Sequence, residues 1–303
     1  MRAWTWLHPV VALVLAPLLG GLIARTKAVL AGRIGAPLLQ PYRDLARLLR
    51  KESVYSRTTT AVFRAAPMAG LAAVSVATLV VPFGGAPALL AFPGDFVLVV
   101  GLLAIGRFGT VLAALDTGSS FEGMGASREV QLAALAEPAL FLALAAVGLA
   151  AQGTSLSGMQ AASSVESWLR AGPALPLVAA ALLAVVLAEN ARIPVDDPNT
   201  HLELTMIHEV MVLDHSGPDL AFILYGSALK LWVMGALLVN VVLPIRTGSA
   251  WTDGAVSLGG MALLAVAIGL IESSMARLRL TRVPQLLVGA ATLAALALVL
   301  VLR

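Results

Sequence analysis

The chain has 303 residues, of which 59% are hydrophobic and only 12% are charged, with a formal net charge of +3. Soluble domains contain about 25% charged residues, so this composition excludes a water-soluble globular enzyme and indicates a protein embedded in lipid. The chain contains no cysteine. Disulfide bonds and a self-contained, thiolate-bound iron–sulfur cluster are therefore excluded.

Apolar segments of membrane-spanning length recur along the chain. Their aliphatic residues do not alternate with polar ones as in a transmembrane β-strand. The sequence therefore predicts an all-α membrane protein, a single polytopic domain over residues 1–303. The first segment lacks a small-residue cleavage site and precedes a basic stretch, so we interpret it as a retained span. The eight predicted transmembrane helices cover residues 7–24, 62–82, 95–115, 132–151, 173–189, 219–243, 255–272 and 284–302.

Lysine and arginine are unequally distributed between the two sides of these spans. Of the 20 Lys and Arg residues, 14 lie in or beside the loops after the first, third, fifth and seventh spans, four lie on the opposite side and two lie inside spans. Cytoplasmic loops carry the excess of Lys and Arg. We therefore expect these loops to be cytoplasmic and both termini to face outside. The basic charge reflects topology, and no nucleic-acid partner is expected.

The first cytoplasmic loop contains an amphipathic segment over residues 38–51. Its leucines are spaced for one helical face, while Arg43, Arg47 and Arg50 belong to the other. This pattern predicts a cytoplasmic helix lying at the membrane interface. Anchoring to lipid and docking of a cytoplasmic partner are both open interpretations, and they are compatible.

Ionisable residues inside the spans are functional candidates, because each costs roughly 2.5–3.5 kcal/mol at the centre of a bilayer. Arg107, Glu137 and Lys230 lie inside the third, fourth and sixth spans. Asp116 and Glu189 lie at the cytoplasmic ends of the third and fifth spans. One explanation is structural pairing of the cations with Glu137 or Glu189. The other is a hydrated path on which these residues relay protons or ions.

The loop after the fifth span is the most acidic part of the chain, with seven acids between residues 189 and 219. Asp197 followed by a proline is suited to begin a helix, which we predict over residues 198–213. Together with Glu189, the acids of this loop that are predicted to take part in the relay are Asp196, Asp197, Glu203 and Glu209.

The same loop contains two histidines that could suggest a metal site. His201 and His208 lie two helical turns apart near carboxylates, but without the His-Glu-x-x-His spacing of a zinc hydrolase. The chain also has no Gly-x-Ser-x-Gly, Walker or dinucleotide-binding glycine motif. We therefore predict neither a metal site nor a catalytic residue.

Three segments resemble signatures of subunit 1 of respiratory complex I and of its relatives in membrane-bound group 4 nickel–iron hydrogenases. They are Gly-Arg-Ile-Gly-Ala-Pro at 32–37 with its continuation to residue 52, Glu-Asn-Ala-Arg-Ile-Pro-Val-Asp at 189–196, and Arg-Leu-Arg at 277–279. The resemblance covers essentially the whole chain. Residues 199–209 depart from the quinone-reducing branch and are similar to the formate hydrogenlyase and hydrogenase-4 branch.

The resemblance implies a membrane anchor and proton- or ion-translocation subunit of a formate hydrogenlyase or energy-converting hydrogenase complex in the cell inner membrane. It implies no cofactor in this chain, with the nickel–iron site and iron–sulfur clusters in partner subunits. Those partners would be hydrogenase large and small subunits and an iron–sulfur protein on the cytoplasmic side, antiporter-like membrane subunits, and lipid. The residues expected to dock the cytoplasmic partners are Arg33, Arg43, Arg47, Arg50, Arg192, Arg277 and Arg279.

Two other functions are open on the sequence alone. A quinone-site subunit of a complex I-like oxidoreductase would have a quinone cavity between the first, fifth and sixth spans and the first loop. A stand-alone secondary transporter would be active by itself, although the sequence shows no pairing of broken spans between its two halves.

Overall fold

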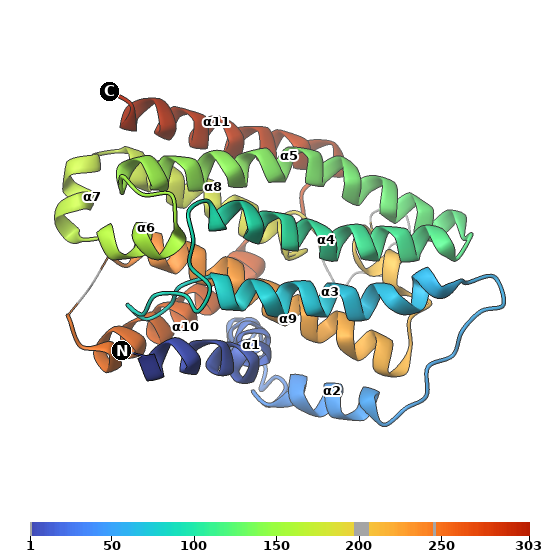
Figure 1. Ribbon diagram of the computed structural model, residues 1–303. Helices are drawn as coiled ribbons and strands as arrows, with labels where there is room; N and C mark the ends of the chain where they lie inside the picture. Colours follow the sequence, from blue (N-terminus) through green and yellow to red (C-terminus); the bar gives the residue numbers. More distant parts are fainter. Residues whose placement is uncertain (1, 197–205, 245–246) are drawn as a thin grey trace.

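The computed structural model describes residues 2–196, 206–244 and 247–303. Helices make up the regular structure in these ranges, and no β-strand occurs in them. The all-α prediction is therefore confirmed, and Figure 1 shows the helices packed as one bundle. The eight long helices are α1 (Arg2–Leu30), α3 (Ala61–Val80), α4 (Asp95–Asp116), α5 (Ser120–Ala150), α8 (Ala174–Glu189), α9 (Gly217–Val242), α10 (Ala250–Ser274) and α11 (Val283–Val301).

Shorter elements connect the long helices. Seven helices in the described ranges are long and apolar enough to cross a membrane, and the bent pair formed by α7 and α8 supplies an eighth when it is counted as one span. This pair bends by 99°. The connecting elements are α2 (Gln40–Leu49), α6 (Leu156–Ala162), α7 (Val165–Ala171) and the 3-10 turns η1 (Glu209–Val212) and η2 (Leu280–Arg282).

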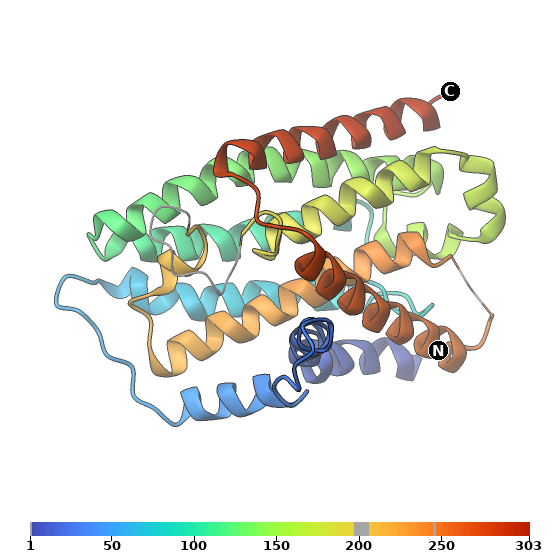
Figure 2. The ribbon, with the colours of Figure 1, turned by 180° about the vertical axis from the view of Figure 1, so that it is seen from behind.

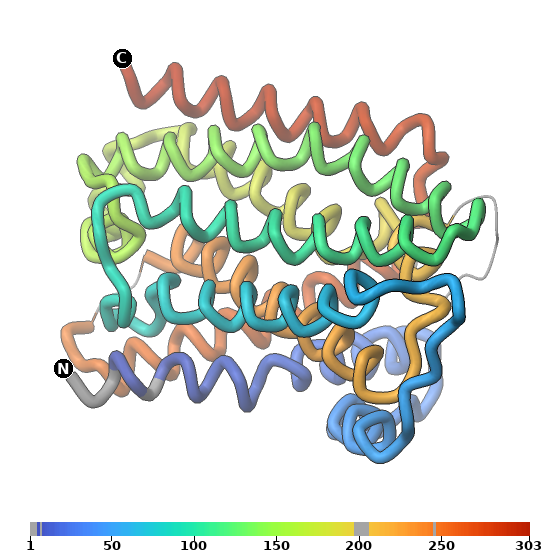
Figure 3. The backbone as a smooth tube through the Cα atoms, turned by 45° about the vertical axis from the view of Figure 1, so that its right-hand side comes forward, coloured from blue at the N-terminus to red at the C-terminus, as the bar shows by residue number. Residues whose placement is uncertain are grey.

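The helices form three layers. In Figure 1, α11 and α5 lie at the top, α4, α3 and α9 in the middle, and α10 and α1 at the bottom. Figure 3 shows α3 and α4 side by side; a Cβ atom built on Gly70 would lie 3.7 Å from the Cα atom of Gly106, so their backbones approach closely. Helix α1 begins and α11 ends at the same end of the bundle, while α2 lies towards the other. This placement of the termini agrees with an even number of spans.

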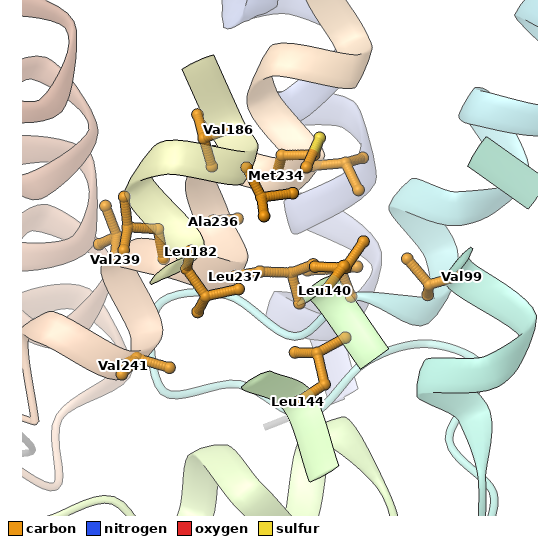
Figure 4. Close-up of a cluster of buried hydrophobic side chains, with 14 of the residues drawn as sticks. Val99, Leu140, Leu144, Leu182, Val186, Met234, Ala236, Leu237, Val239 and Val241 are labelled. Atoms are coloured by element: carbon orange, nitrogen blue, oxygen red, sulfur yellow. The ribbon is translucent and has the colours of Figure 1, made fainter. Parts of the chain in front are cut away.

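The apolar core lies where α4, α5, α8 and α9 meet, and α9 is its central helix. Lipid is as apolar as these side chains, so the hydrophobic effect does not drive the helices together inside the membrane. Close packing of the side chains holds them together instead. Figure 4 shows the interdigitated side chains, among which are Val99, Leu140, Leu144, Leu182, Val186, Met234, Leu237 and Val241.

The structure differs most from the sequence prediction at the start of α5 and in the segment before α9, while α1 (Arg2–Leu30) and α10 (Ala250–Ser274) extend several residues beyond the predicted spans. Helix α5 begins at Ser120, twelve residues before the predicted start of the fourth span. Its first turns are helical because Gly125 and Ala126 pack against the loop that contains η1. The predicted helix over 198–213 is wrong for residues 206–213, where only the short turn η1 occurs. Here Met206 and Ile207 pack into two different apolar clusters. The rest of that prediction, including Asp197 as the N-cap, lies outside the described residues.

The end of the first loop is fixed to the start of α9. Gly217 has φ +55°, and a Cβ atom there would lie 2.6 Å from the backbone oxygen of Glu52, so only glycine fits. The Ser53 hydroxyl donates to the Ser216 carbonyl at 3.3 Å, and the Val54 amide donates to the Ser216 hydroxyl at 2.9 Å. The basic first loop is thus anchored beside the helix that carries Lys230.

Candidate functional site

Arg107 of α4 forms the centre of a buried charged cluster, and its side chain is only 8% exposed. The guanidinium contacts Glu137 of α5 at 2.5 Å and Glu189 of α8 at 2.5 Å. It also lies 3.4 Å from Glu129, two turns before Glu137 on α5. The planar fork of five N–H donors suits one arginine to several carboxylates. One cation therefore connects three helices at this depth.

Lys230 of α9 completes the cluster from the opposite side. Its Nζ atom lies 2.8 Å from Glu189. The side chain of Glu189 is 4% exposed and binds both Arg107 and Lys230. The pairing that the sequence suggested for Arg107, Lys230, Glu137 and Glu189 is present in the structure. With Glu129 included, three carboxylates face two cations, so the fully ionised cluster carries one excess negative charge. A role in relaying protons or ions stays a prediction.

His208 lies beside this cluster on the segment that leads into η1. Its backbone amide donates to Asp196 at 3.1 Å. Burial, together with the positive charge of Lys230, lowers the pKa of His208 to about 4. The imidazole is therefore neutral at pH 7 and adds no charge to the cluster. In the ranges that the structure describes, no group of three or more His, Cys, Asp or Glu side chains is placed to hold a metal ion; His201 lies outside them.

Two cavities meet at the cluster. The larger, between α3, α4 and α9, has an empty volume of about 570 Å³ and is lined by Arg107, Glu129, His208 and Lys230 at its polar end. Its other walls are mostly apolar, apart from Thr110 and Ser227. The smaller, of about 330 Å³, is lined by Glu129, His208 and Glu189 together with Asp196. Glu129 and His208 thus border both cavities, so a proton or ion crossing between them would pass these two side chains.

The remaining residues predicted for the relay lie in different surroundings. Asp116 accepts hydrogen bonds from the backbone amides of Thr60 at 2.6 Å and Phe63 at 3.3 Å, so it caps the start of α3. Asp196 pairs with Arg277 at 2.8 Å. Glu209 begins η1, and Asp197 and Glu203 lie outside the described residues.

The arginines predicted to dock a partner divide into two groups. Arg192 lies 3.4 Å from the buried Glu272, and Arg277 binds Asp196, so both hold segments together at the end of the bundle where α1 and α8 end. Lys27 of α1 also binds Glu272, at 2.7 Å. The others are exposed, namely Arg33, Arg43, Arg47, Arg50 and Arg279. Of these, Arg47 contacts Asp44 of the same helix.

Glu129 is the member of the cluster that the sequence analysis missed. It stands in the polar stretch Ser-Arg-Glu-Val-Gln at 127–131, which is typical of the end of a loop. The available signal was its spacing of eight residues from Glu137, about two turns of a helix. Had the fourth span been extended towards its N-terminus, both acids would have shared one side of it.

Comparison with known proteins places these features in a family context. Residues 4–303 match the family described as NADH dehydrogenase. Formate hydrogenlyase subunit 4 of Escherichia coli (strain K12) is 34% identical over 294 residues, covering 92% of this chain and 93% of that protein. Hydrogenase-4 component C of the same organism is 32% identical, covering 88% and 85%. An NADH-quinone oxidoreductase subunit of Syntrophotalea carbinolica is 29% identical, covering 71% and 68%.

A solved structure has the same fold. A chain of the membrane-bound sulfane sulfur reductase, described as an archaeal respiratory membrane complex, aligns with a TM-score of 0.82. The alignment covers 98% of this chain and 99% of that one at 21% sequence identity. At this identity the likeness establishes the architecture of the bundle.

Proposed function

This chain belongs to the NADH dehydrogenase family, and on this premise we propose that it is the membrane anchor and ion-translocation subunit of a formate hydrogenlyase or energy-converting hydrogenase complex. The two relatives above 30% identity are named as subunits of such systems and align along most of their length. Electron transfer would occur in a docked soluble arm that holds the nickel–iron site and iron–sulfur clusters. This chain would couple that reaction to movement of protons or other ions.

The observation that carries the proposal is the asymmetry within the charged cluster. Glu189 is bound to Arg107 at 2.5 Å and to Lys230 at 2.8 Å, which favours its ionised form. Glu129 is more loosely held, at 3.4 Å from Arg107, and borders both cavities. One excess negative charge in a buried site favours uptake of one proton. Glu129 is the proposed carrier of that proton, with Glu137 and Glu189 setting the local charge.

The proposed orientation places the α2 end of the bundle in the cytoplasm and both termini outside. The excess of Lys and Arg in the odd-numbered loops supports this topology. Exposed Arg43 and Arg47 of α2, and Arg50 directly after it, would then face the soluble arm. The partners in this proposal are hydrogenase large and small subunits and an iron–sulfur protein there, with antiporter-like subunits beside the bundle in the membrane.

Purification through a tag on this chain tests the proposal. A nickel-containing large subunit should co-purify, and the preparation should evolve hydrogen in the absence of quinone. Turnover that requires quinone and is blocked by quinone-site inhibitors would favour the complex I-type function instead. A chain that purifies alone and transports ions would establish a secondary transporter.

A further inference from the structure

A basic cleft lies where α1 and α10 end. Figure 2 shows the last turns of these two helices beside each other and close to the start of α2. The cleft has an empty volume of about 1270 Å³, which includes open solvent. Lys27 and Arg33 line it together with Leu30 and Leu270. It is separate from the Arg107 cluster, with which it shares no lining residue.

A second hollow lies against the same loop segment, residues 31–39. It has an empty volume of about 740 Å³ and is lined by Arg25, Arg43 and the apolar side chains of Leu38 and Leu39. The guanidinium of Arg25 donates to the backbone oxygen of Ile34, which fixes the position of this charge. The segment is therefore flanked by cations on both sides.

The positive charge at these hollows is only partly compensated. Among the described residues, no acidic side chain lines either of them. The charge of Lys27 is balanced by the buried Glu272 at 2.7 Å. Within the described part of the chain, the structure shows no acidic partner for Arg25, Arg33 or Arg43. Three guanidinium groups are thus available to an anion, and guanidinium groups bind phosphate through paired N–H donors.

Apolar surface leads from the cleft along the membrane-facing side of α10. Leu30 is 51% exposed and Leu270 is 46% exposed at the cleft itself. Leu263, two helical turns before Leu270 on the same face, is 65% exposed. A ligand that satisfies both parts of this surface has an anionic head and an apolar tail.

We propose that the cleft at the ends of α1 and α10, which is lined by Arg33, binds the phosphate headgroup of an anionic phospholipid together with Arg25. The side chain of Arg25 lies next to Gly35, which lines the same cleft, because a Cβ atom built on Gly35 would lie 4.0 Å from its Cδ atom. The acyl chains of the lipid lie along Leu270 and Leu263. Basic pockets between transmembrane helices on the cytoplasmic side are suited to such headgroups. A protein partner would cover the arginines but would leave the leucines of α10 at the level of the membrane without a role.

Lipid titration of the purified complex tests the site. The complex is delipidated in detergent and titrated with phosphatidylglycerol or phosphatidylcholine, and bound lipid is counted by native mass spectrometry. The wild-type complex should retain phosphatidylglycerol selectively. The variant carrying Arg25→Gln and Arg33→Gln should bind it on the order of tenfold more weakly. Arg170→Gln, at an exposed arginine on α7, is the matched control and should bind like wild type.

Four outcomes would overturn the proposal. Equal retention of phosphatidylcholine would show that charge is not recognised. Displacement of the lipid by millimolar inorganic phosphate would assign the cleft to a soluble anion. Unchanged phosphatidylglycerol binding by the double variant would show that the two arginines do not bind the lipid. If the double variant loses the soluble arm but still binds phosphatidylglycerol, this surface is a protein interface.

Discussion

At the scale of single residues, Arg107 controls the charge balance of the buried cluster. It neutralises carboxylates from two helices and is itself largely enclosed. Removing one partner of a buried ion pair costs about 3–5 kcal/mol, because the other charges are left unpaired. Arg107→Gln should therefore lower both the amount of assembled complex and its thermal unfolding midpoint. Arg107→Lys keeps the charge but loses the planar guanidinium. Its amount of complex and its unfolding midpoint should lie between those of Arg107→Gln and wild type.

Arg170→Gln provides the matched control for Arg107. Arg170 pairs with Glu166 at the surface of α7, where both side chains are 78% exposed, and exposed pairs contribute little. It should leave the unfolding midpoint unchanged. An Arg107→Gln complex that accumulates and melts like wild type would show that the three carboxylates do not need this cation.

His208 predicts a pH dependence of stability. Its pKa in the folded protein, about 4, lies below the ordinary value of 6.5, so the unfolded chain binds more protons between these values. The stabilising contribution is fully present above about pH 6.5 and is lost as the pH falls towards 4. His208→Gln should flatten this part of the curve when the unfolding midpoint is measured from pH 7 to 4. Parallel curves for the two proteins would contradict the buried, neutral histidine.

The sequence was sufficient to select most of the cluster, because Arg107, Glu137 and Lys230 are conspicuous inside apolar segments and Glu189 ends one. It could not select Glu129, because the sequence neighbours of Glu129 are polar. Which side of this part of α5 is buried depends on the loop that packs against it. That loop carries His208 and lies far from Glu129 in the sequence. Contacts of this kind are set by tertiary structure, and hydrophobic periodicity does not report them.

At the scale of elements, the contact between α5 and η1 positions His208 beside Glu129. A Cβ atom on Gly125 would overlap a methyl group of Val210 and would lie 2.9 Å from the backbone oxygen of Ile207. Gly125→Ala should therefore push η1 away from α5, at a cost of about 1–3 kcal/mol for overpacking. The expected result is faster proteolysis within residues 190–216 and reduced coupled activity.

Gly101→Ala on α4 is the matched helical control, because a Cβ atom there meets nothing within 4 Å. Alanine favours a helix more than glycine does, so this variant should be as resistant to proteolysis as wild type. Equal proteolysis of both variants would mean that η1 does not depend on close contact with α5.

The long apolar helices were predictable from the sequence because a lipid environment requires runs of about 20 apolar residues. The amphipathic α2 was also predictable, because leucines on one helical face and arginines on the other fit the membrane interface. The loop at 206–213 was not. Its acids and the proline at 198 favoured a helix locally, whereas in the structure residues 206–213 form only the short turn η1, with Met206 and Ile207 in two different clusters. The bend between α7 and α8, in contrast, has a local cause, because Gly172 has φ +57° and Pro173 follows it.

At the scale of the whole molecule, the exposed arginines of α2 and its C-cap are proposed to hold the soluble arm. Replacing Arg43, Arg47 and Arg50 together with glutamate reverses the charge of this surface. The soluble subunits should no longer co-purify, while the chain still inserts into the membrane. Arg170→Glu, on α7, should leave the complex intact. Co-purification of the full complex with the triple variant would assign α2 to lipid anchoring alone.

The central claim is that protonation of Glu129 couples the soluble arm to ion movement. It is tested by reconstituting the complex into proteoliposomes and following hydrogen evolution together with a pH- or potential-sensitive dye. Glu129→Gln should assemble, because Glu137 and Glu189 still neutralise Arg107 and Lys230, and should evolve hydrogen without a dye response. Glu166→Gln, at a surface acid of α7, should respond like wild type. A full dye response from Glu129→Gln at a wild-type rate of hydrogen evolution would contradict the account.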